Sequence, residues 1–254
     1  MKYFVKPDSI IKQIWGKADT VLFIFAGAAA EFALNKAVDW LYYTGKLPAD
    51  PLGRLFSTVT YAQQIIFAEH DYAVKAIDKI TAIHQSIEAA RGARIPDWAY
   101  RDVLFMLIDY SIRSFEVLER ELTGAEKDEV FDVFYRMGQR MQLAGLPVSY
   151  IEWVVMRRGH LHDNLVKSHL TIDLFKQYRK HLGAIRYLLL KQVQLLVVPS
   201  AVRQLLPFKN VLWIKPLLYL YRLSRLIKAD YFVKQALLPA DYKVQIRALD
   251  VAAA

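Results

Sequence analysis

Three polar side chains in the first third of the chain are of types that could bind a ligand: Arg54, Thr58 and His84. The histidine stands in an apolar stripe, because Ile80, His84 and Ile87 recur at helical spacing and therefore share one face of a helix. A buried imidazole needs a partner for its nitrogens, since burying an unpaired polar group costs about 1 to 3 kcal/mol. That partner is either a metal ion or a protein hydroxyl or carbonyl, and the second case is the more common one.

Arg54 and Thr58 lie four residues apart, on one face of a helix that Asp50-Pro51 is expected to start. A guanidinium beside a hydroxyl suits an anionic group such as a carboxylate, because arginine binds carboxylates through two hydrogen bonds and keeps its charge when buried. A salt bridge between Arg54 and a nearby acidic side chain is the alternative explanation.

The segments around these residues have helical periodicity, and no strand pattern competes with it. Capping boxes at Thr123–Glu126 and Ser149–Glu152 mark helix starts, and Gly92 and Gly145 mark helix ends. The pattern predicts helices at residues 8–16, 19–43, 51–68, 71–90, 97–121, 124–144, 149–166, 171–197 and 216–238. Since there is no repeat and no long linker, we expect a single all-α domain over residues 1–254, built by helix-on-helix packing.

Composition restricts the chemistry that the chain can perform. It contains no cysteine, which excludes disulfides, thiolate metal sites, iron–sulfur clusters and cysteine nucleophiles. It also lacks the Glu-x-x-His pair of di-iron bundles, a Walker loop, a Rossmann glycine pattern and a nucleophile elbow. Any metal therefore needs histidine or carboxylate ligands. Apolar residues make up 55% of the chain, as in a soluble protein with a large core or in one that rests on a membrane.

The longest apolar run, from Val21 to Ala30, is shorter than the roughly 20 residues that span a membrane. The N-terminus, from Met1 to Trp15, lacks the apolar core of a secretory signal. We therefore expect a cytoplasmic protein, and peripheral contact with a membrane is compatible with that location. The small residues from Ala26 to Ala30 predict close packing against another helix, with room for a flat ligand as the alternative.

Positive charge is concentrated near the C-terminus. The whole chain has a net charge of +9, and residues 199–254 contain nine basic and three acidic residues. Arg222, Arg225 and Lys228 alternate with apolar residues, which predicts a helix on an anionic membrane surface; a docking helix with a solvated basic face explains the pattern equally well. Nucleic acid is not an expected partner, because no helix-turn-helix, zinc finger or aromatic platform accompanies the charge.

The stretch from Asp50 to Thr58, followed by the helix that carries Ile83-His84 and ends near Gly92, resembles a known family. This is the haem-b oxygenase superfamily of the latex-clearing rubber oxygenases and the fungal ER-bound oxygenase of mycophenolic acid biosynthesis. The Arg-x-x-x-Thr spacing and the helical histidine carry the resemblance, and a more diffuse likeness covers residues 8–239.

The resemblance implies an all-α domain with a haem-sized pocket between its helices. This pocket would hold haem b, with His84 as the axial ligand of the iron and with Arg54 and Thr58 beside the porphyrin and its propionates. The implied activity is that of an oxidoreductase that uses dioxygen on a hydrophobic, often isoprenoid, small-molecule substrate.

A carboxylate near the bound oxygen would act as a base in such an enzyme. The helix before Arg54 offers Glu31 and Asp39, which are eight residues apart and roughly share a face. Ordinary surface or paired acids are the alternative explanation for both. Asp109 either orients a buried partner, or it is an acidic residue at the edge of the core that forms a hydrogen bond with a neighbouring helix.

Two positions depart from the family pattern. The rubber-cleaving branch has a lysine directly before the motif threonine, where this chain has Ser57, and many relatives have Trp-Val-His where it has Phe105-Met106-Leu107. Rubber itself is therefore not the expected substrate. Two readings without catalysis also fit the residues: a helical protein that binds a lipid or isoprenoid, and a basic peripheral membrane protein.

Overall fold

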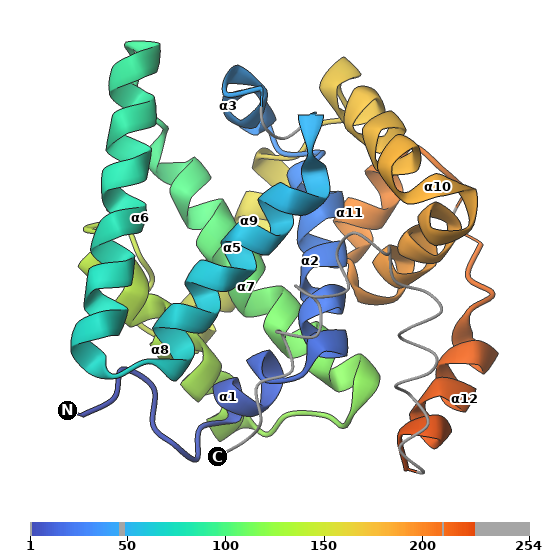
Figure 1. Ribbon diagram of the computed structural model, residues 1–254, viewed down its shortest axis with the longest axis horizontal. Helices are drawn as coiled ribbons and strands as arrows, with labels where there is room; N and C mark the ends of the chain where they lie inside the picture. The colour runs from blue at the N-terminus through green and yellow to red at the C-terminus, as the bar shows by residue number, and fades with distance from the viewer. Residues whose placement is uncertain (1, 46–48, 210, 227–254) are drawn as a thin grey trace.

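The computed structural model describes residues 2–45, 49–209 and 211–226, and apart from two isolated bridges the regular elements of these residues are helices. The predicted all-α class is therefore confirmed. Figure 1 shows α6 along one side of the molecule, α10 and α12 along the other, and α2, α5 and α7 between them. The helices are α1 (Ile10–Trp15), α2 (Ala18–Phe32), α3 (Val38–Tyr43), α5 (Pro51–Phe67), α6 (His70–Arg91), α7 (Asp97–Leu118), α8 (Gly124–Arg140), α9 (Tyr150–Asp163), α10 (His169–Val197), α11 (Ser200–Leu205) and α12 (Lys215–Leu226).

Several predicted helix ends are confirmed by their hydrogen bonds. Thr123 and Glu126 form the reciprocal capping box that starts α8. Ser149 caps α9, because its hydroxyl accepts a hydrogen bond from the amide of Glu152. Gly92 ends α6 with a φ of 67°, a left-handed conformation that glycine adopts without steric cost.

Tight packing of α2 against α7 occupies the middle of the core. A Cβ atom built on Gly27 would lie 2.3 Å from Cδ1 of Tyr110, which is far inside van der Waals contact. The small residues of α2 thus make the close helix contact that the sequence predicts.

Gly27→Ala is expected to lower the free energy of unfolding by about 1 to 3 kcal/mol, because the added methyl group has no space beside Tyr110. Gly159→Ala in α9 is the matched control, since a Cβ there meets nothing within 4 Å; it should raise stability by roughly 0.5 to 1 kcal/mol through its helix propensity. Urea unfolding measures both changes, and a Gly27→Ala protein as stable as the parent would contradict the close contact.

The helix predicted over residues 19–43 is two helices, α2 and α3, separated by a break at residues 33–37. Asn35 organises the break: its Oδ1 accepts a hydrogen bond from the Ala37 amide, and its Nδ2 donates one to Asp102, both at 2.8 Å. The backbone of Asn35 also bridges to Leu165, between α9 and α10. Contacts with distant segments therefore override the local helical pattern.

Two further differences concern the C-terminal part of the chain. The long helix α10 is bent at Gly183, whose φ of 74° and ψ of 174° are not helical. Helix α11 was not predicted. The predicted helix 216–238 overlaps α12, and its last part lies outside the described residues. Within the described ranges, none of the helices combines the length and the apolar run that crossing a membrane requires.

Candidate functional site

The candidate site lies where α5 and α6 diverge. These two helices meet at a short connection, residues 68 and 69, and separate toward their other ends (Figure 1). Arg54 on α5 and His84 on α6 are almost equally many residues away from this connection. Because the rise per residue of a helix is constant, both residues lie at a similar distance from it. The start of α5 is fixed as predicted, because Oδ1 of Asp50 accepts a hydrogen bond from the Gly53 amide at 2.8 Å and Pro51 is the first helical residue.

A cavity of about 950 Å³ opens between these helices, and it is lined by residues of α2, α3, α5, α6, α7, α8 and α10. Its volume is at the upper end of the range of about 300 to 1,000 Å³ that is usual for small-molecule sites. All three residues singled out from the sequence, Arg54, Thr58 and His84, contribute to the wall. Most other lining residues are apolar, and no described aspartate or glutamate is among them. The cavity therefore suits a largely apolar ligand with an anionic group.

The imidazole of His84 has a buried Nδ1 atom with no hydrogen-bond partner among the described residues. The ring of Tyr100 packs against it edge to face, with ring centroids 5.2 Å apart. The Tyr100 hydroxyl in turn donates a hydrogen bond to Glu88 at 3.1 Å, which fixes this neighbouring ring. A core histidine is more commonly one whose ring nitrogens form hydrogen bonds with protein groups. The described residues provide no such hydrogen bond for Nδ1 of His84.

Burial, together with the nearby positive charge of Arg54, lowers the pKa of His84 below its ordinary value of 6.5, while Glu88 acts in the opposite direction. Burial also lowers the pKa of Arg54. In the described part of the chain no carboxylate forms an ion pair with Arg54, so the salt-bridge alternative is not supported. At neutral pH the site thus presents a neutral imidazole, the form that binds metals, beside an arginine that no described carboxylate neutralises.

The lowered pKa of His84 predicts how stability changes with pH in the ligand-free protein. The unfolded chain takes up this proton near pH 6.5, the folded protein only at lower pH. Between these values the unfolded state binds more protons, so stability falls as the pH falls below about 6.5, by at most about 1.4 kcal/mol per pH unit. Urea unfolding at several pH values should show a smaller loss for His84→Phe; equal losses would contradict the burial of a neutral imidazole.

The hydroxyl of Thr58 is engaged within its own helix. It donates a hydrogen bond to the carbonyl oxygen of Arg54 at 3.1 Å, and the hydroxyl of Ser57 donates to the same oxygen at 2.8 Å. Since its hydrogen is used in this way, Thr58 can offer only its oxygen, as an acceptor, to a ligand in the cavity.

The two predicted base candidates do not line the cavity. Glu31 is almost completely buried, and both of its oxygens accept hydrogen bonds from Arg157 at 2.6 Å. Asp39 accepts a hydrogen bond from Arg91, also at 2.6 Å, near the surface. Both residues are therefore paired acids, and their role as catalytic bases stays a prediction.

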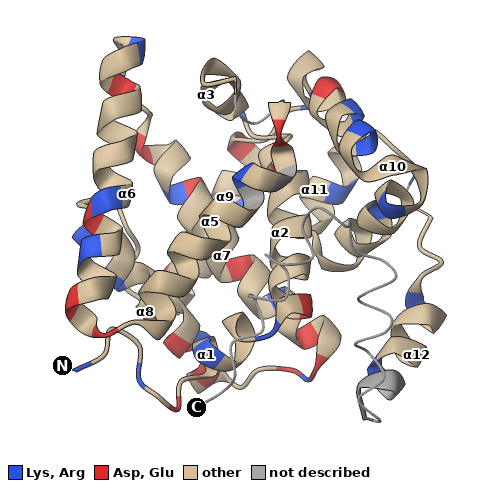
Figure 2. Cartoon of the chain, in the orientation of Figure 1, with Lys and Arg blue, Asp and Glu red and all other residues tan. Residues whose placement is uncertain are grey.

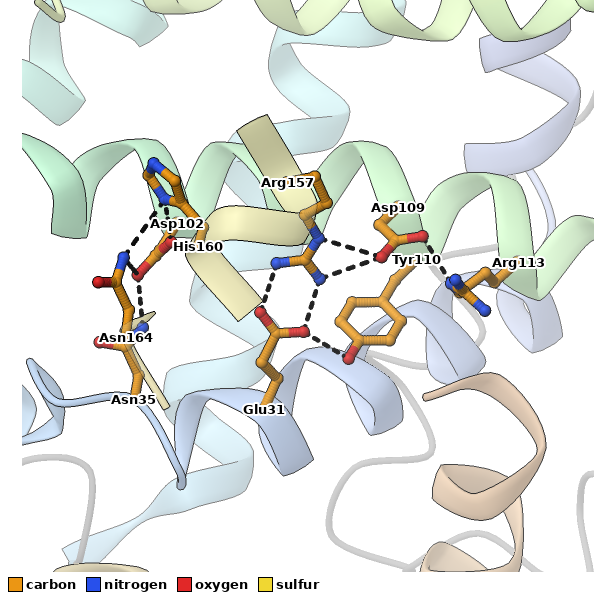
Figure 3. A network of polar contacts seen from close by, with 9 residues as sticks. All are labelled: Glu31, Asn35, Asp102, Asp109, Tyr110, Arg113, Arg157, His160 and Asn164. Atoms are coloured by element: carbon orange, nitrogen blue, oxygen red, sulfur yellow. Dashed lines mark hydrogen bonds and ion pairs between the residues drawn. The ribbon is translucent and has the colours of Figure 1, made fainter. Parts of the chain in front are cut away.

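A network of buried charges behind the cavity was missed from the sequence (Figure 3). Arg157 on α9 lies between Glu31 on α2 and Asp109 on α7, and Asp109 also accepts a hydrogen bond from Arg113 at 2.6 Å. Tyr110 donates a hydrogen bond to Glu31 at 2.7 Å. Burial alone would lower the pKa of Arg157, but the attraction of Glu31 and Asp109 outweighs it and raises that pKa above the ordinary value. Asp109 thus orients a buried partner, which is one of its two predicted readings.

Arg157 and His160 are largely buried, although the charged residues around them in the sequence, Arg158, His162 and Asp163, suggest a solvated segment. Both lie in α9, and their side chains are 4% and 12% exposed. Nδ1 of His160 lies 2.5 Å from Oδ1 of Asp102, and Asp102 also accepts a hydrogen bond from Asn164 (Figure 3). A usable signal was present, since the buried Trp153 and the residues 157, 160 and 164 recur at helical spacing.

No group of three or more histidine, aspartate or glutamate side chains suitable for a metal ion occurs among the described residues. A metal bound at His84 would therefore have to bring its other ligands with it, as the iron of a prosthetic group does.

Comparison with known proteins gives one match. The family model described as "ER-bound oxygenase mpaB/B'/Rubber oxygenase, catalytic domain" matches residues 15–230. No curated protein and no solved structure matches the chain. The matched range includes the α5–α6 pair, every residue that lines the cavity, and the buried network behind it.

Proposed function

Because this chain belongs to the mpaB and rubber oxygenase family, we propose that it is a haem-b-dependent oxygenase in which His84 is the axial ligand of the iron. Membership in the family supports an oxygenase that acts on a small molecule with dioxygen. The proposal adds the haem, its ligand, and a hydrophobic, isoprenoid or lipid-like substrate.

One observation carries the proposal: within the described part of the chain, a buried imidazole nitrogen without a hydrogen-bond partner and an arginine without a paired carboxylate line the same apolar cavity. Leaving either group unpaired costs free energy, so each is expected to have a partner when the protein functions. Haem b offers both partners in one molecule, an iron for the imidazole and propionates for the guanidinium.

The remaining residues of the cavity fit such a group. Ala26, Ala28 and Ala29 on α2 line the wall without bulky side chains, which leaves space for a flat ring. Arg54 would hold a propionate through two hydrogen bonds. Thr58 could donate to a propionate only after giving up its hydrogen bond to the Arg54 carbonyl oxygen. The chemistry that a bound haem supplies is the activation of dioxygen.

The protein's own contribution is binding, orientation and exclusion of water. Apolar residues of α7 and α10, such as Met106, Leu107 and Leu189, line the cavity, and they would bind a hydrophobic substrate and keep water from the reaction. We also propose Glu31 or Asp39 as the catalytic base. To act as a base, either carboxylate would first have to break its hydrogen bond with an arginine.

Titration of the purified protein with haem b tests the proposal. Arg54→Gln is expected to weaken haem binding by about 10-fold to 150-fold, the equivalent of the 1.5 to 3 kcal/mol of a charged hydrogen bond. The parent should prefer haem b to haem dimethyl ester, and the variant should not. Arg94→Gln is the control, because Arg94 is exposed and does not line the cavity.

A parent protein that binds haem b and its dimethyl ester equally well would contradict the assignment of Arg54. A protein that takes up a fluorescent isoprenoid or fatty acyl probe, but no haem, would instead be a non-catalytic lipid-binding protein with the same cavity.

A further inference from the structure

Large apolar side chains are exposed along α12 and the segment before it. Val211, Trp213, Leu217, Tyr219 and Leu220 are 45% to 63% exposed, and we call these five residues the α12 ridge. Leu217 and Leu220 are three residues apart in α12, so they lie on one face of this helix, and Trp213 stands just before its first residue. Contiguous exposed apolar groups of this kind mark interaction surfaces.

Side chains next to the ridge hold α12 against the body of the protein. Ile214 is buried, and the hydroxyl of Tyr221 donates a hydrogen bond to Asp19 on α2 at 3.0 Å. The side chain of Gln192 on α10 forms hydrogen bonds with the backbone of Val211 and of Trp213, at 2.9 and 3.0 Å. The ridge is therefore the outward side of an anchored element, next to α10.

The segments that carry the ridge contain charges of one sign only. The sequence contains no aspartate or glutamate between Asp173 and Asp230, and Figure 2 shows lysine and arginine segments along α10 and α12 on this side of the molecule. Lys209 and Lys215, both exposed, flank the ridge. An apolar surface with exposed cations along it complements a surface that is apolar beneath a layer of negative charge.

We propose that the α12 ridge docks on an anionic lipid bilayer. Its side chains would enter the boundary between headgroups and acyl chains, where tryptophan and tyrosine are favoured, and Lys209 and Lys215 would meet lipid phosphates. A second copy of the chain is a poorer occupant, because self-association would bring the two sets of cations together.

Docking on this side would place the bilayer close to the cavity. Leu182 and Leu189 of α10 line the cavity, whereas Ile185 and Leu188 of the same helix are exposed. Helix α10 thus has one side toward the cavity and another toward solvent, and its Gln192 contacts the segment that carries the ridge. The proposal does not depend on haem, since it rests on the exposed ridge and its charge alone.

Co-sedimentation of the full chain with vesicles tests the proposal. We expect binding to phosphatidylcholine vesicles that contain phosphatidylserine and much weaker binding to phosphatidylcholine alone. Raising the salt from about 0.1 M to about 1 M should release the protein, because the screening length falls from about 10 Å to about 3 Å. Lys209→Gln and Lys215→Gln should each weaken binding about fivefold.

The combined variant Trp213→Ser, Leu217→Ser, Leu220→Ser should weaken binding by at least about tenfold without lowering the melting temperature, since these side chains are exposed. Ile151→Ser with Val155→Ser is the control, because these apolar residues are even more exposed, at 77% and 66%, but lie on α9. In the unaltered protein, brominated lipids should quench more fluorescence than in Trp213→Phe.

Three outcomes would overturn the proposal. These are no preference for anionic vesicles, equal binding by the parent and the ridge variant, and a dimer in sedimentation velocity that the ridge variant abolishes. The last outcome would assign the ridge to a second copy of the chain.

Discussion

His84→Ala is expected to abolish the Soret absorption of the haem-loaded protein. The imidazole is the one proposed protein ligand to the iron, and Nδ1 has no competing partner among the described residues. Loss of an outer-shell partner already costs about 10-fold to 100-fold in metal affinity, so loss of the ligand itself should cost more than about 100-fold. Haem titration followed by absorbance measures the change.

Two controls separate ligation from folding in this experiment. His162→Ala removes a histidine whose side chain is 89% exposed, and it should leave the Soret band unchanged. Free imidazole added to His84→Ala should restore part of the band, because the substitution leaves space beside the iron. A His84→Ala protein that retains haem with the parent spectrum would show that another group is the ligand.

Arg157→Met is expected to lower the free energy of unfolding by about 3 to 5 kcal/mol. The substitution leaves Glu31 and Asp109, which are 1% and 6% exposed, without the cation between them. An unpaired buried charge is more costly than a missing pair, so Arg157→Met with Glu31→Gln should recover part of the loss.

The same measurement on Arg113→Met provides the control for this prediction. Arg113 also binds Asp109, but its side chain is 41% exposed, so its loss should cost no more than about 1 kcal/mol. If the two substitutions lower the free energy of unfolding by similar amounts, Arg157 is not the residue that stabilises the two buried carboxylates.

Local signals in the sequence predicted the elements that carry the site. The Asp50-Pro51 start of α5 and the apolar stripe around His84 depend on residues within a few turns of each other, and the structure has both. The all-α class follows from the same periodicity. Helix caps and helix faces could therefore be predicted, because they depend on local sequence patterns.

Features that depend on distant contacts were not open to prediction. The break after α2 needs Asn35 to meet Asp102 and Leu165, and the burial of Arg157 needs Glu31, far away in the sequence. Neither partner can be identified from spacing along one helix. The bend at Gly183 was missed for another reason, because a single glycine within a long helical pattern is compatible with a straight helix.

Our claim that His84 binds the iron of haem b can be tested on freshly purified protein. The pyridine haemochrome assay, combined with the iron content, measures the bound cofactor. We predict haem b and iron in equal amounts, with both lost from His84→Ala. A parent protein that carries neither and does not take up added haem, although it is folded, would contradict the claim.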